Sequence, residues 1–135
     1  MLAMGRRDQY KDVYPDLYTL GSTPNAGKRG RRANPKTGAW YSPEGQHLKA
    51  EGMLAGTPDV HWPIARHGYW SLYVEMKKNG ESLTPEQRDM IPRLRDQGNL
   101  VVILYTGVDL WNVCVWYAGL PSHLYIPTDY LDLDF

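Results

Sequence analysis

Two short runs of alternating side chains, separated by residues 65–69, constrain the fold of this chain more than any other feature. In residues 60–64 every second side chain is apolar, and residues 70–77 repeat the pattern. The connection between the two runs is short and contains Gly68, which favours a β-hairpin. The alternation therefore predicts a pair of strands with one apolar face and one polar face.

The polar face of the predicted hairpin carries two acids and a lysine. Glu75 and Lys77 lie side by side on the second run, and Asp59 directly precedes the first. If Trp62 pairs with residues 70–72, Asp59 falls close to Glu75. Two carboxylates near an amine can hold a divalent cation beside a phosphodiester, because hard cations prefer oxygen ligands.

The remaining segments predict a mixed α/β domain with a central sheet flanked by helices. Thr84 is a helix cap, Pro85 suits the first helical position, and Gln87 completes a capping box. This helix should run to Gln97 with a bend at Pro92. Other expected elements are a helix over 4–13, a strand over 16–23, a helix over 43–51, a buried strand over 100–105, and a segment over 109–117 that fits either a strand or a helix.

Length and cysteine content bound the class of protein. A chain of 135 residues is one domain with a core of ordinary size, here residues 1–135. The single cysteine, Cys114, excludes an intrachain disulfide and fits a buried side chain in a reducing cytoplasm. We expect no membrane association, because no apolar run approaches about 20 residues.

Charge is distributed unevenly along the chain. Residues 1–52 carry nine Lys or Arg and five Asp or Glu, a balance of +4, whereas residues 91–135 carry two and five, a balance of −3. We expect a flexible basic loop over residues 24–39 and a Tyr- and Asp-rich tail over 120–135. The loop either solubilises the chain or binds phosphates. The candidate phosphate contacts are Lys28, Arg29, Arg31, Arg32 and Lys49.

Each of these signals also has an ordinary explanation. A Glu-x-Lys pair on a strand is usually solvated, and Asp after Pro is common turn chemistry. Gln87 is explained by its cap alone, although its place on the helix also allows it to face the sheet near Glu75. His61 is either a neighbour of the acids or a polar surface residue.

Several runs together resemble a known family. The sequences EGMLAGTPDV, LYVEMKK, LTPEQRDMI and LRDQGNLVVIL occur in that order, preceded by PNAGKR at residues 24–29. They resemble the VRR-NUC domain of the PD-(D/E)xK nuclease superfamily, over about residues 14–105. The resemblance implies a restriction-endonuclease-like core and metal-dependent hydrolysis of DNA phosphodiester bonds.

The resemblance also implies roles for particular residues. Mg²⁺ or Mn²⁺ would be held by Asp59, Glu75 and the backbone carbonyl of Met76. Lys77 would be the active-site lysine, with Gln87 at the edge of the catalytic site. Small stand-alone members look like phage or bacterial nucleases, some of which act on branched DNA as homodimers. We therefore expect DNA as the partner, a homodimer, and the cytoplasm of a bacterial host cell.

One departure from the family keeps a rival open. The family usually carries a glutamate on its first helix, and no acid occurs at the expected spacing; Asp8 or Asp12 could substitute. If no acid replaces it, the chain could be a non-catalytic DNA-binding or assembly module on the same fold. A nuclease acting on RNA is a third possibility.

Overall fold

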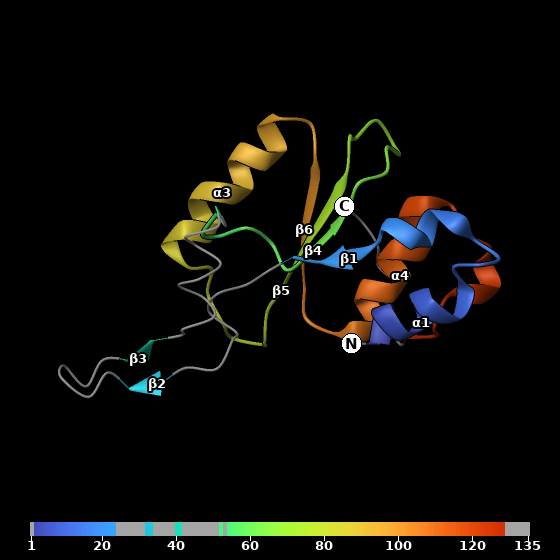
Figure 1. The fold of residues 1–135 in the computed structure, drawn as a ribbon, viewed down its shortest axis with the longest axis horizontal. Coiled ribbons are helices and arrows are strands. Elements are labelled where there is room, and N and C mark those ends of the chain that lie inside the picture. Colours follow the sequence, from blue (N-terminus) through green and yellow to red (C-terminus); the bar gives the residue numbers. More distant parts are fainter. Residues whose placement is uncertain (1, 24–31, 34–39, 42–51, 53, 129–135) are drawn as a thin grey trace.

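A four-stranded mixed sheet forms the centre of the molecule (Figure 1). The computed structural model describes residues 2–23, 32–33, 40–41, 52 and 54–128. The strand order is β1-β4-β5-β6, in which β1, β4 and β5 pair antiparallel and β6 runs parallel to β5. The strands are β1 Gly21–Ser22, β4 Val60–Trp62, β5 Leu72–Met76 and β6 Leu100–Leu104.

Helices cover the two faces of this sheet differently. Helix α3, Pro85–Asp96, lies on one side, and α4, Gly107–Ala118, lies on the other with α1, Leu2–Tyr10, packed against it (Figure 1). The smaller elements are the 3-10 helices η1 Pro15–Thr19 and η3 Ser122–Leu124, and a separate antiparallel pair, β2 Arg32–Ala33 with β3 Trp40–Tyr41.

The register of the hairpin follows the alternation predicted from the sequence. Trp62 pairs with Leu72 and Val60 pairs with Val74. All four side chains are fully buried in the apolar core that the sheet shares with α4. A shift of either strand by one residue would turn its own apolar side chains out of the core, so the core fixes this pairing.

The ambiguous segment over 109–117 is helical. Thr106 caps α4 by accepting a hydrogen bond from the Asp109 N–H, at 3.1 Å, and the helix ends at Gly119 in the left-handed conformation with φ 67°. Leu110, Trp111 and Val113 are completely buried. Burial all round a helix is expected here, because α4 lies between the sheet and α1.

The predicted strand over 16–23 is wrong in its first half. Residues Pro15–Thr19 form a 3-10 helix, and only Gly21–Ser22 is a strand. Two contacts distant in sequence hold this turn: Trp62 Nε1 donates to the Asp16 carbonyl at 2.8 Å, and Arg66 forms an ion pair with the Asp16 carboxylate at 2.6 Å. Tertiary structure therefore overrides the local strand propensity.

Several other expected elements differ from the structure in their bounds or lie outside the described residues. The first helix spans Leu2–Tyr10 rather than 4–13. Within the expected loop over 24–39, Arg32–Ala33 is a strand, because it pairs with Trp40–Tyr41; the rest of that loop lies outside the described residues. The expected helix over 43–51 and tail residues 129–135 also lie outside them.

Candidate active site

Asp59 is held at the start of β4 by bonds to both neighbouring strands. Its Oδ2 accepts the backbone N–H of Met76 at 2.9 Å. Its own carbonyl accepts the N–H of Thr23 at 2.8 Å, and the Thr23 hydroxyl donates to the carbonyl of Pro58. With 6 % of its surface exposed, the Asp59 carboxylate is a buried acid of fixed orientation.

Glu75 lies on β5 and is 1 % exposed. Val60 on β4 is aligned with Val74 on β5. Because the two strands are antiparallel, the next residues in line with each other are Asp59 and Glu75. The amide Nε2 of Gln87 donates to Glu75 Oε1 at 2.9 Å, so Glu75 faces α3. The sheet therefore brings two buried carboxylates together on the face opposite α4.

Gln87 combines the two roles that its sequence position allows. Its Oε1 accepts the Thr84 N–H at 2.9 Å, and its own N–H donates to the Thr84 hydroxyl at 3.2 Å, which completes the capping box. Its Nε2 bonds to Glu75 at the same time. The cap therefore fixes the side chain that in turn orients a buried acid.

Gly56 lets the chain before Asp59 approach α3. Its φ is +83°, and an added Cβ would lie 2.4 Å from the Glu86 carbonyl oxygen and 3.0 Å from the Gln87 nitrogen. Any other residue would combine an unfavourable backbone conformation with a backbone overlap. In the sequence, the signal for this contact is a glycine two residues before Pro58.

Met76 and Lys77 continue from Glu75 at the end of β5. The Met76 side chain packs against the core on the α4 side, so only its backbone can serve the opposite face. The Lys77 N–H donates to the Leu104 carbonyl at 2.9 Å, and its side chain is partly exposed. Strand alternation assigns this amine to the side that carries Glu75.

His61 and Tyr73 form a ring pair beside the acids. Their ring centroids are 4.1 Å apart with an interplanar angle of 15°. Burial lowers the pKa of His61 and raises the pKa of Tyr73, so both side chains are neutral near pH 7. Alternation along the strand places His61 on the same face of the sheet as Asp59, and its ring contact there is with Tyr73.

Asp8 and Asp12 do not reach this site. Asp8 pairs with Arg7 at 3.0 Å and Lys11 at 3.7 Å, and Asp12 accepts a hydrogen bond from the Tyr18 hydroxyl. Helix α1 packs on α4, across the sheet from α3 (Figure 1). Neither acid replaces the first-helix glutamate in this arrangement.

Most of the predicted phosphate contacts lie outside the described residues. Lys28, Arg29, Arg31 and Lys49 lie outside the described residues, and for Arg32 only the pairing in β2 is described. Within the described part of the chain, His, Cys, Asp and Glu side chains form no group of three suited to a metal ion. The described side chains that could bind a cation at the site are therefore the two carboxylates, Asp59 and Glu75.

The fold and these acids define a restriction-endonuclease-like α/β domain. Residues 31–107, more than half of the chain, match the VRR-NUC domain, and the chain belongs to that family. A solved structure described as a VRR_NUC domain protein is 24% identical, with a TM-score of 0.54, over 78% of this chain and 71% of that one. A search of curated proteins gives no match.

Membership of this family indicates a nuclease-type, DNA-related function. The two motifs that contain Asp59 and Glu75 lie within the residues that match the family. In the part of the chain that the structure describes, no helix combines the length and apolar character needed to cross a bilayer.

Proposed function

We propose that this chain hydrolyses DNA phosphodiester bonds with the help of Mg²⁺ or Mn²⁺. The observation that carries the proposal is the juxtaposition of Asp59 and Glu75, 6 % and 1 % exposed, on neighbouring strands. Two buried like charges on neighbouring strands repel each other, and a cation bound between them would remove that cost.

The donor set suits a hard divalent cation. Asp59, Glu75 and the carbonyl of Met76 would hold the ion, since Mg²⁺ and Mn²⁺ take carboxylate and carbonyl oxygens together with water. A carboxylate has about four lone-pair sites, so the hydrogen bonds at Asp59 Oδ2 and Glu75 Oε1 are compatible with this role. When bound, the ion supplies Lewis-acid activation of a water and of the scissile phosphate.

The chain's own residues contribute orientation and charge. Lys77 would place its ammonium group beside the phosphate, where it orients the attacking water and stabilises the negative charge that develops on the phosphate oxygens. The water oxygen forms a bond to phosphorus while the ester bond to the leaving oxygen breaks, and the leaving oxygen takes up the proton that the water gives up. Gln87 acts as a positioning residue, because its amide fixes one oxygen of Glu75.

A cleavage assay with matched lysine variants tests the proposal. Supercoiled and branched DNA, and RNA in parallel, are incubated with Mg²⁺, with Mn²⁺ or with EDTA. We expect cutting of DNA with either metal and none in EDTA. Lys77→Ala should abolish cutting but retain DNA binding, whereas Lys78→Ala, the same charge change at the exposed neighbour, should cut normally. Equal cutting by both variants would remove Lys77 from the reaction.

Metal binding can be measured without activity. Calorimetry with Mn²⁺ should give a weaker association for Glu75→Gln than for the unmodified protein, because the substitution removes one charged ligand and keeps the shape. Indistinguishable titrations would contradict the cation site directly.

A non-catalytic DNA-binding or assembly module is the second candidate. It is favoured by the absence, within the described residues, of a third metal-ligating side chain beside the two acids. Such a module would bind DNA without cutting it under any metal. A homodimer that acts on branched DNA is the finer form of the first proposal, because a symmetric pair presents two sites. Light scattering of the protein and a comparison of branched with linear substrates test it.

A further inference from the structure

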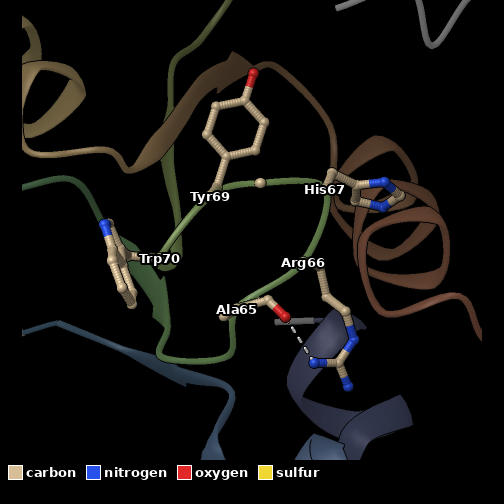
Figure 2. A pocket seen from close by; sticks show the side chains of 6 residues that line it. Ala65, Arg66, His67, Tyr69 and Trp70 are labelled. Carbon is tan, nitrogen blue, oxygen red and sulfur yellow. Dashed lines mark hydrogen bonds between the residues drawn. The ribbon is translucent and has the colours of Figure 1, made fainter.

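The turn between β4 and β5 displays two aromatic side chains on a rigid frame. Residues 65–70, the hairpin tip, line a shallow hollow of about 460 Å³ (Figure 2). Trp70 is 74% exposed and Tyr69 is 37% exposed, and neither belongs to the core. In Figure 2 both rings point away from α4, whereas His67 points toward it.

Three contacts hold the hairpin tip in place. His67 and Gly68 have φ values of 54° and 83°, and Arg66 and Tyr69 exchange backbone hydrogen bonds of 3.2 and 2.8 Å, which defines a tight two-residue turn. The His67 ring stacks on Trp116 at 4.2 Å with an angle of 1°. A non-glycine residue with positive φ persists only where its surroundings hold it there.

The charge of the tip is already compensated. Arg66 forms an ion pair with Asp16 at 2.6 Å and donates to the carbonyl of Ala65 at 2.8 Å. The tip therefore offers aromatic surface rather than net positive charge. Aromatic rings stack on unpaired bases, an interaction worth about 1–3 kcal/mol per base.

Both exposed rings directly precede β5, the strand that carries Glu75. Five residues of β5 and its approach separate Trp70 from Glu75, about 17 Å at about 3.3 Å per residue. Trp70 also contacts Gly98 at the far end of α3, since a Cβ there would lie 2.6 Å from its ring. Gln87, which bonds to Glu75, lies in the first turn of α3, and Gly98 lies two residues past its end, so α3 runs alongside the segment from Glu75 to Trp70.

We propose that Tyr69 and Trp70 stack on unpaired bases of a DNA strand that is bound at the acids. The proposal rests on the proposed function and adds a basis for preferring DNA with single-stranded segments over fully paired duplex.

The test measures binding in EDTA, where no hydrolysis is expected. The probes are a duplex that contains a ten-nucleotide single-stranded gap and the matching fully paired duplex. We expect Trp70→Leu to weaken binding of the gapped DNA about 5- to 150-fold, which converts to about 1–3 kcal/mol, and to change binding of the paired duplex little. Trp70→Phe should retain most of the affinity, because a ring remains.

Salt dependence separates stacking from phosphate contact. Trp70→Leu should leave the slope of log affinity against log salt unchanged, because no phosphate contact is lost. Tyr18→Leu is the matched control, since Tyr18 is a 57% exposed aromatic on η1 whose side chain contacts Asp12 and Lys11. It should bind both probes like the unmodified protein.

Distinct outcomes would overturn the proposal. Equal affinity of Trp70→Leu and the unmodified protein for gapped DNA would remove the stacking role, as would an equal loss on both probes. Conversion of a dimer to a monomer by Trp70→Leu, seen by light scattering without DNA, would assign the surface to a second copy of the chain. Failure of the metal-dependent cleavage assay would reject the proposed hydrolysis but would leave this binding result standing.

Discussion

The hydrogen bond from Gln87 to Glu75 joins α3 to the acid-bearing face of the sheet, and its contribution to stability can be measured. Gln87→Ala removes the donor to a buried carboxylate and the acceptor of the Thr84 N–H. A hydrogen bond to a charged group contributes about 1.5–3 kcal/mol and a helix cap about 0.5–2 kcal/mol. We therefore expect the free energy of unfolding to fall by about 2–5 kcal/mol.

Thr84→Ala is the matched control for this substitution. It removes the hydroxyl that accepts the Gln87 N–H but leaves the bond to Glu75, so it should cost only about 0.5–2 kcal/mol. Gln87→Glu keeps an acceptor for the cap and replaces the amide donor with a third carboxylate. We expect its loss to be at least as large as that of Gln87→Ala near pH 7, and to shrink when millimolar Mg²⁺ is added.

Urea denaturation followed by circular dichroism, at pH 7 in EDTA, gives the three free energies under one condition. Gln87→Ala should lose more free energy of unfolding than Thr84→Ala, by about the value of one charged hydrogen bond. Equal losses for the two variants would refute this expectation, because the bond to Glu75 would then contribute nothing beyond the cap.

Three further predictions concern other parts of the molecule. Gly56→Ala should lower the free energy of unfolding by about 1–3 kcal/mol in the same urea titration, because its Cβ meets backbone of α3 at positive φ; an unchanged midpoint would contradict that contact. Asn112→Ala should speed amide hydrogen exchange at Ile126, because Asn112 both donates to and accepts from that residue at 2.8 Å; unchanged exchange would show that the tether is not needed. Burial raises the pKa of the Cys114 thiol to about 12, so a thiol reagent at pH 8 should react only with unfolded chains. Because this thiol ionises more readily when unfolded, stability should fall as pH rises above about 9.

The part of the site that sequence predicts is the part governed by local periodicity. Alternation in β4 and β5 gives the pairing of Trp62 with Leu72, and this pairing alone brings Asp59 toward Glu75. The capping box of α3 can likewise be predicted from the sequence, because Thr84 and Gln87 occupy the positions that a helix start requires.

The remainder depends on contacts between distant segments. The 3-10 turn at Pro15–Thr19 is held by Trp62 and Arg66, about fifty residues away in sequence, so no local pattern predicts it. The bond between Thr23 and Asp59 has the same origin. In both cases the contact joins segments that become neighbours only when the whole domain has folded.

The pairing of β4 with β5 has a consequence for the population of molecules as a whole. Trp62, Leu72 and Val74 can be buried only when the two strands are aligned in one way. A chain misaligned by a single residue would turn Glu75 into the apolar layer and lose its core at the same time. Such chains would unfold rather than persist. Every folded molecule should therefore have the same position of Glu75 relative to Asp59.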